Sequence, residues 1–156
     1  MLSIEPTQSC LCGSEQSYEE CCGKFINTIQ TAKNPEQLMR SRYSAYILKN
    51  ENYLLQSWHE STRPDSLDLT IDTTQWKKLK IISATENKVH FVAYFTQDTL
   101  NKEKIYALTE ISNFVKDKNW QYLEGKDVKT VQLTKNMPCP CQSGKKYKRC
   151  CESEIK

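Results

Sequence analysis

The sequence predicts an α+β fold in which helices come first, a sheet of consecutive strands follows, and a short cysteine-rich segment lies at each end. Three observations support this prediction. Apolar residues recur with a helical period over residues 34–58. From residue 76 onward the period changes to two, which is typical of strands. All eight cysteines of the 156-residue chain fall in two windows, residues 10–22 and 139–151.

Composition excludes several classes of protein. With 38% hydrophobic residues the chain can bury the core of one domain with small attachments. No run approaches the roughly 18 apolar residues that a membrane helix needs. The start, Met1 to Pro6, has neither the basic residues nor the apolar stretch of a secretory signal. We therefore expect a cytoplasmic protein without membrane contact, and a net charge of +3 by itself indicates no partner.

The two cysteine windows share one frame, C-x-C-x-S-x-x-x-Y-x-x-C-C. Its members are Cys10, Cys12, Ser14, Tyr18, Cys21 and Cys22 in the first window, and Cys139, Cys141, Ser143, Tyr147, Cys150 and Cys151 in the second. Stable disulfides are rare in a reducing cytoplasm, and four thiolates are the ligand number of a closed tetrahedral zinc site. The frame therefore predicts one structural zinc ion in each window, two per chain.

Three alternatives to zinc remain open. Disulfides would need bridges between the windows, since adjacent cysteines seldom pair with each other. Redox chemistry usually employs C-x-x-C or an isolated low-pKa thiol, whereas four thiolates could also hold iron or an iron–sulfur cluster. Within each window we expect the serine, Ser14 or Ser143, to N-cap a short helix. Tyr18 and Tyr147 are expected to cover the apolar side of the site.

Both windows resemble the SEC-C motif, a zinc-binding segment best known at the C-terminus of the preprotein-translocase motor ATPase. Residues 138–148, PCPCQSGKKYK, are close to its consensus. Cys22 and Cys151 stand where the last ligand of the motif is often His, which is a known variant. The first window departs from the consensus at residues 15–17, where Glu-Gln-Ser replaces the usual Gly and basic residues. The resemblance implies metal in both windows, with different surfaces.

The region between the windows is predicted to be a separate domain. Asn34-Pro35 is a typical helix start, and the helix it begins is interrupted at residues 50–52 before a short second helix over 53–58. The predicted strands are 76–85, 89–96, 105–116 and 120–124. Linkers are expected over residues 24–33 and 126–137. The chain is thus predicted to divide into an N-terminal cysteine segment (1–24), a central domain (25–133) and a C-terminal cysteine segment (134–156).

Three segments of this region resemble a known family: residues 38–46 (LMRSRYSAY), 53–55 (YLL) and 58–64 (WHESTRP). They resemble the YchJ-like (UPF0225) family, which places an NTF2-like domain behind an N-terminal SEC-C motif and often has a second SEC-C motif at the C-terminus. The resemblance implies a cone in which N-terminal helices pack in a curved antiparallel sheet that encloses a cavity. It implies no established activity. Thr109 precedes Glu110 where a family His is expected, which argues against catalysis through that His.

The candidate pocket residues are Arg42, Tyr46, Trp58, His59 and Glu110. Arg42 lies within an apolar helical stripe and must be paired or face a wet cavity, because an isolated buried charge is costly. Glu110 is its candidate partner, in a structural ion pair beneath the sheet or in a ligand-binding pair. Trp58 and His59 end the second helix where the cone should open, and His59 is either a capping residue or a general base.

Charge separates the two windows. The first contains Glu15, Glu19 and Glu20 and no Lys or Arg, a side-chain total of −3, whereas the second contains Lys145, Lys146, Lys148 and Arg149, a total of +4. These are solvated faces, or the second window contacts an acidic partner such as ribosomal RNA or a protein surface. No nucleophile–base set and no phosphate-binding loop is recognisable. The sequence thus favours a non-enzymatic zinc-binding adaptor of proteins or ribosomes. The alternative is a small-molecule binder or enzyme that uses the cavity.

Overall fold

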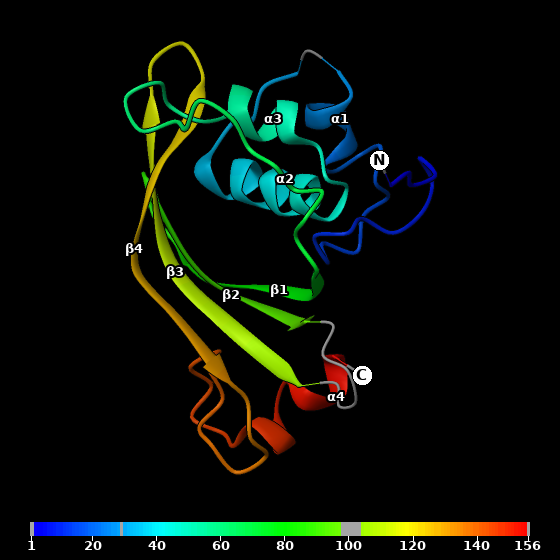
Figure 1. The fold of residues 1–156 in the computed structure, drawn as a ribbon, viewed down its shortest axis with the longest axis vertical. Coiled ribbons are helices and arrows are strands. Elements are labelled where there is room, and N and C mark those ends of the chain that lie inside the picture. Colours follow the sequence, from blue (N-terminus) through cyan, green and yellow to red (C-terminus); the bar gives the residue numbers. More distant parts are fainter. Residues whose placement is uncertain (1, 29, 98–103, 156) are drawn as a thin grey trace.

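A four-stranded antiparallel sheet curves around the helices (Figure 1). The computed structural model of the chain describes residues 2–28, 30–97 and 104–155. Within these ranges no helix is both long and apolar enough to cross a membrane. The helices precede the sheet along the chain, so the predicted α+β order is confirmed.

Three helices lie on the concave side of the sheet: α1 (Gly23–Ile26), α2 (Pro35–Ile47) and α3 (Glu51–Gln56). The Asn34 side chain accepts a hydrogen bond from the backbone N–H of Gln37 at 2.9 Å, which caps α2 as predicted. Asn50 caps α3 in the same way, through the N–H of Tyr53. This cap explains why α3 begins two residues before the predicted start at residue 53.

The sheet is a meander of β1 (Thr74–Ala84), β2 (Lys88–Gln97), β3 (Ile105–Lys116) and β4 (Trp120–Gln132), paired in sequence order. The last strand corrects the predicted linker at 126–137, since β4 stays paired with β3 as far as Gln132. Residues 126–132 are all exposed, so no alternation of apolar and polar residues could mark them as strand. The other predicted linker, 24–33, contains most of α1.

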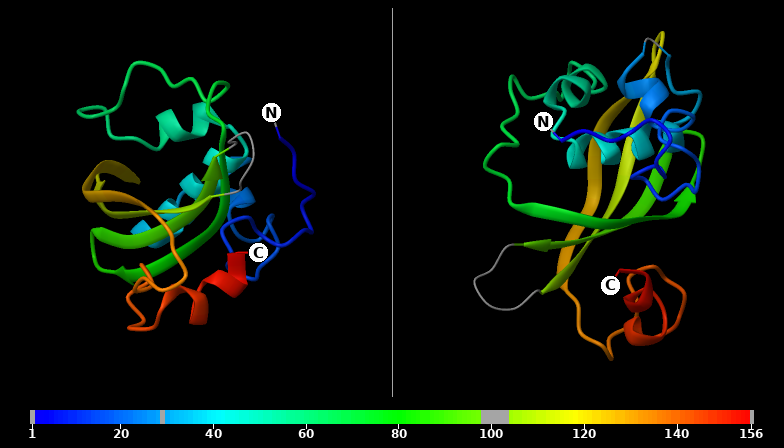
Figure 2. Two further views of the ribbon diagram at one scale, coloured as in Figure 1. Left: turned by 60° about the horizontal axis from the view of Figure 1, so that its bottom comes forward. Right: turned by 90° about the vertical axis from the view of Figure 1, so that its right-hand side faces the viewer.

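The two cysteine segments pack on opposite faces of this sheet. Along β2, Phe91 and Ala93 point to the concave face and share a hydrophobic cluster with α2 and the first segment, residues 10–22, which we call the N-terminal finger. Val92 and Tyr94 point the other way and share a cluster with the C-terminal finger, residues 139–151. Figure 2 (right) shows the helices above the sheet and the C-terminal segment, with its short helices η1 (Tyr147–Arg149) and α4 (Glu152–Ile155), below it. Each finger therefore shares its core with the central domain.

Candidate metal centres and central cavity

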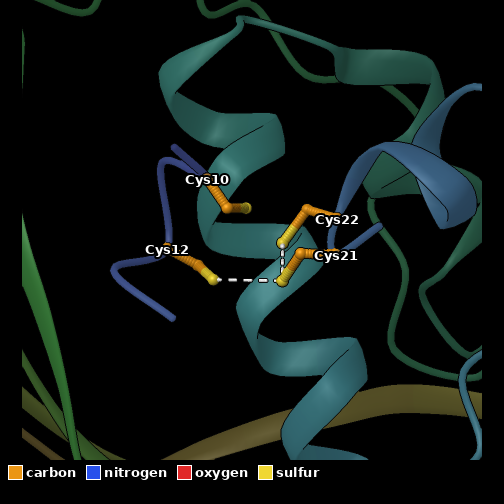
Figure 3. A group of neighbouring side chains, drawn as sticks. All are labelled: Cys10, Cys12, Cys21 and Cys22. Atoms are coloured by element: carbon orange, nitrogen blue, oxygen red, sulfur yellow. Dashed lines mark hydrogen bonds between the residues drawn. The ribbon is translucent and has the colours of Figure 1, made fainter. Parts of the chain in front are cut away.

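The four sulfurs of the N-terminal finger converge on one point beside α2 (Figure 3). The Cys12 and Cys21 sulfurs are 3.6 Å apart, those of Cys21 and Cys22 are 3.9 Å apart, and all four lie within 4.8 Å of one another. Four sulfurs placed tetrahedrally at about 2.3 Å from a zinc ion would be about 3.8 Å apart. All four cysteines are buried. The group can therefore hold one metal ion without large movement of its ligands.

The C-terminal finger repeats this geometry. Its Cys141 and Cys150 sulfurs are 3.5 Å apart, and those of Cys150 and Cys151 are 3.9 Å apart. Again the four ligand atoms lie within 4.8 Å of one another. Cys150 is partly exposed, whereas the other three cysteines of this finger are buried. The two groups thus offer the same ligand set with different access for solvent.

The serines of the repeated frame face the sulfurs and do not cap helices. The Ser14 hydroxyl lies 3.1 Å from the sulfur of Cys21, and the Ser143 hydroxyl lies 3.1 Å from that of Cys150. The short helices that follow have no side-chain cap, so the predicted N-caps are wrong. A hydroxyl at this distance can donate to a thiolate, which is what a metal-bound sulfur requires of its surroundings. Tyr18 and Tyr147 are buried in the same clusters as the sulfurs, as expected.

Hydrogen bonding lowers the pKa of Cys12 and Cys21 in the N-terminal finger and of Cys141 in the C-terminal finger, and so favours their thiolate forms. The bond from Cys22 lowers the pKa of Cys21 to about 6, although burial opposes it. Burial is the largest single influence on Cys141 and disfavours its thiolate, but the hydrogen bonds from Ser143, Cys139 and Cys150 together outweigh it and lower the pKa of that thiol to about 6. Since the thiolate is the form that binds metal, these cysteines are the ligands of each group that would ionise first.

The central domain contributes polar contacts to both groups. From α2, the Ser44 hydroxyl lies 4.0 Å from the Cys10 sulfur, and Arg40 donates to the backbone carbonyl of Cys12 at 3.1 Å. From the other face of the sheet, the Tyr94 hydroxyl lies 3.7 Å from the Cys139 sulfur. Lys80 on β1 donates to Cys151 at 3.9 Å. These residues were not predicted from the sequence, because they lie outside the cysteine windows.

A cavity of about 240 Å³ lies between α2 and the concave face of the sheet. Of the predicted pocket residues, Arg42, Tyr46 and Glu110 line it. The others do not. Trp58 is not part of the cavity lining but packs against Arg42, with its ring centre 5.1 Å from the guanidinium carbon. His59 lines a separate surface groove, where its Nδ1 is 2.7 Å from the Ser61 hydroxyl and its Nε2 is 3.7 Å from a carboxylate oxygen of Asp117.

Arg42 and Glu110 do not form the predicted ion pair in the part of the chain that the structure describes. Arg42 donates through Nη1 to the Leu54 carbonyl and to the Ser57 hydroxyl, both at 2.7 Å. Its guanidinium carbon lies 4.5 Å from the centre of the Tyr122 ring. The Tyr122 hydroxyl in turn donates to Glu110 Oε1 at 3.1 Å. An aromatic ring thus separates the two charges.

The cavity is also lined by residues on the later strands that were not predicted from the sequence, notably Ser112 on β3 and Tyr122 on β4. Tyr122 had a usable signal, because it alternates with Trp120 along a predicted strand and so should point to the same face of the sheet. Ser112 had none, since a single serine in a strand is usually on the surface. Here it is buried and donates to Glu110 at 2.8 Å.

The predicted polyanion contacts, Lys145, Lys146, Lys148 and Arg149, are all exposed. None of them forms an ion pair among the residues that the structure describes. The backbone of Lys148 is bonded to that of Lys135, whose side chain is also exposed. The finger therefore carries basic side chains that no acidic group of the described chain neutralises.

Comparison with protein families now identifies two parts of the chain. Residues 34–125 match the family model of the YchJ middle NTF2-like domain, and residues 136–153 match the SEC-C motif. A UPF0225 protein from Vibrio cholerae is 39% identical over 154 residues, which cover 92% of this chain and 99% of that protein. A UPF0225 protein from Photorhabdus laumondii is 38% identical over 162 residues, which cover 93% of this chain and 99% of that protein.

Two solved structures are similar. A SEC-C motif containing protein from Rhodopseudomonas palustris matches with a TM-score of 0.65 and 30% identity, covering 78% of this chain and all of that one. A SEC-C motif containing protein from Psychrobacter arcticus matches with a TM-score of 0.59 and 26% identity, covering 96% of this chain and 98% of that one. The two UPF0225 relatives, with the matching middle domain, show that the chain belongs to the UPF0225 family, as its sequence segments predicted.

Proposed function

We propose that the protein binds two structural zinc ions, one in each finger, and that the C-terminal finger is an adaptor surface for a polyanionic partner such as ribosomal RNA. The metal part rests on two groups of four sulfurs with the spacing of a tetrahedral site. Zinc fits best because four thiolates close the coordination sphere and leave no position for a substrate. On this proposal the N-terminal finger is a second SEC-C motif whose surface has diverged. Reduced thiols of this kind are suited to a cytoplasmic protein.

The exposed basic side chains of the C-terminal finger carry the adaptor part of the proposal. Four thiolates around a divalent ion contribute about −2 to each finger, so the side-chain totals of −3 and +4 become roughly −5 and +2. Phosphate groups are therefore attracted to the C-terminal finger and repelled by the N-terminal one. Because Lys145, Lys146, Lys148 and Arg149 fall within five consecutive residues and are all exposed, they can act on the same polyanion.

The test is a salt titration of binding to purified ribosomes and to ribosomal RNA. Changing Lys145, Lys146, Lys148 and Arg149 to Gln should weaken binding and flatten its dependence on salt, since fewer counterions are released. Changing Glu15, Glu19 and Glu20 to Gln is the matched control, and should leave binding unchanged or strengthen it. Charge variants are preferable to deleting residues 134–156, because deletion would uncover the apolar face around Val92 and Tyr94.

Both variants should retain two zinc ions per chain by elemental analysis. If the neutralised protein binds as tightly as the unmodified protein at every salt concentration, the basic face is only a solvated surface and the adaptor proposal is wrong. A metal content near zero in reduced, folded protein would contradict the zinc proposal independently.

A further inference from the structure

We propose that the central cavity binds a small zwitterion of the amino-acid class, with an apolar side chain. The cavity of about 240 Å³ lies between α2 and the sheet and is distinct from both cysteine groups. An apolar cavity of about 150 Å³ holds benzene, and drug-sized pockets begin near 300 Å³. A free amino acid is therefore of a suitable size. This site is independent of the zinc and polyanion proposals.

Arg42 provides the binding group for a carboxylate. Its side chain is only 3% exposed, yet no carboxylate lies within 4.0 Å of it among the described residues. Its guanidinium donates to the Leu54 carbonyl and the Ser57 hydroxyl and bonds the Tyr46 side chain, all of which are uncharged groups. The rings of Trp58 and Tyr122 compensate part of the cost of burial. An anionic group in the cavity would supply the ion pair that the described residues do not.

Glu110 provides the binding group for an ammonium. Its Oε1 accepts hydrogen bonds from the hydroxyls of Ser112 and Tyr122, which fix the carboxylate. Gly125 on β4 leaves the space that this carboxylate occupies, because a Cβ atom there would lie 2.4 Å from Oε1. The second oxygen, Oε2, accepts no hydrogen bond from the described chain. Glu110 is therefore a positioned carboxylate with one oxygen free for a charged donor.

The two charges together specify a zwitterion. A ligand that is only an anion would be attracted by Arg42 and repelled by Glu110, and the reverse holds for a ligand that is only a cation. A molecule with both groups satisfies each residue at once. The remaining wall is mostly aromatic, including Tyr43, Trp76 and Phe91. Such a wall favours an apolar side chain over a polar one.

The test uses the full-length zinc-loaded protein and three probes with the same aromatic body. L-phenylalanine carries both charged groups, 3-phenylpropionate lacks the ammonium and 2-phenylethylamine lacks the carboxylate. L-leucine is the smaller zwitterionic probe. Binding is measured by titration calorimetry and by amide chemical shifts of cavity residues. A hydrogen bond to a charged group is worth a factor of about ten or more, so at least one zwitterion should bind about tenfold tighter than the two singly charged probes.

Variants assign the charges to residues. Glu110→Gln should lower the affinity for L-phenylalanine about tenfold. The same variant should strengthen binding of 3-phenylpropionate, because the repulsion between its carboxylate and Glu110 is removed. Arg42→Lys should lower the affinity for 3-phenylpropionate. The amide spectrum of residues outside the cavity reports whether this variant is folded. His59→Gln, outside the cavity, is the matched control and should change nothing. The proposal is overturned if neither zwitterion shifts cavity resonances at millimolar concentration, or if 3-phenylpropionate binds as tightly as L-phenylalanine.

Discussion

The two fingers have the same cysteine frame and nearly the same sulfur distances, yet they are different parts of the molecule. The N-terminal finger has four buried cysteines and shares the main core with α2 and the concave sheet face. The C-terminal finger lies on the opposite face, shares a smaller cluster with Val92 and Tyr94, and leaves Cys150 partly exposed. The frame thus fixes the local geometry of the four sulfurs, whereas the surface beneath it decides how strongly the cysteine group is coupled to the rest of the fold.

The largest expected difference between the fingers comes from loss of one ligand in each. Cys12→Ser should lower the free energy of unfolding by more than about 4 kcal/mol, because a structural metal group inside the main core is lost. Cys141→Ser should cost less and disorder only residues 134–155 and the strand face beneath them. Urea unfolding, followed by tryptophan fluorescence and amide spectra, measures both effects. If the two variants destabilised the central domain by the same amount, the two fingers would not differ in their coupling to it.

A smaller difference should come from the hydroxyls that the central domain presents to the sulfurs. Tyr94→Phe removes the group near Cys139, and Ser44→Ala removes the group near Cys10. Loss of such an outer contact typically lowers metal affinity about 10- to 100-fold. The effect should be greater for Tyr94→Phe, because its contact is shorter, and each variant should affect only its own finger. Competition with a chromogenic chelator gives the two affinities, and weakening of both sites by one variant would show that they are coupled.

The tie between α2 and the N-terminal finger offers a third test. Arg40 bonds both the Cys12 carbonyl and the carboxylate of Glu36, and its side chain is partly exposed. Arg40→Gln should therefore cost about 1 kcal/mol of stability. Protection of finger amides from hydrogen exchange should fall for residues 10–22 and stay the same for residues 139–151. An unchanged exchange pattern would mean that apolar packing alone holds this finger.

The smallest effect is expected at the ion pair between Lys78 on β1 and Glu154 on α4. The bond from Lys78 lowers the pKa of Glu154 below its usual value. Its contribution to stability is therefore present above the ordinary glutamate pKa and is lost as the pH falls through the lowered one. Because both side chains are partly exposed, Glu154→Gln should cost only about 0–1 kcal/mol at neutral pH. Unfolding curves of the two proteins should converge at low pH, and a gap that persists there would assign the effect to something other than charge.

The sequence alone determined the features that depend on local spacing. The cysteine frame gave the two ligand groups, Asn34-Pro35 gave the start of α2, and the period of two gave the first three strands. Even the position of Arg42 in an apolar stripe predicted a buried cation, which the structure confirms. These features are caused by interactions between residues close together in the chain, so the sequence pattern is enough to predict them.

Only the tertiary structure decided what depends on residues far apart in the chain. The sequence could not show that Tyr122 separates Arg42 from Glu110, since that arrangement needs α2, β3 and β4 to meet. Nor could it show that the exposed half of β4 is strand, because backbone pairing with β3 leaves no mark on side-chain polarity. The two fingers themselves lie on opposite faces because side chains alternate along β2, and packing on each face selects a different partner.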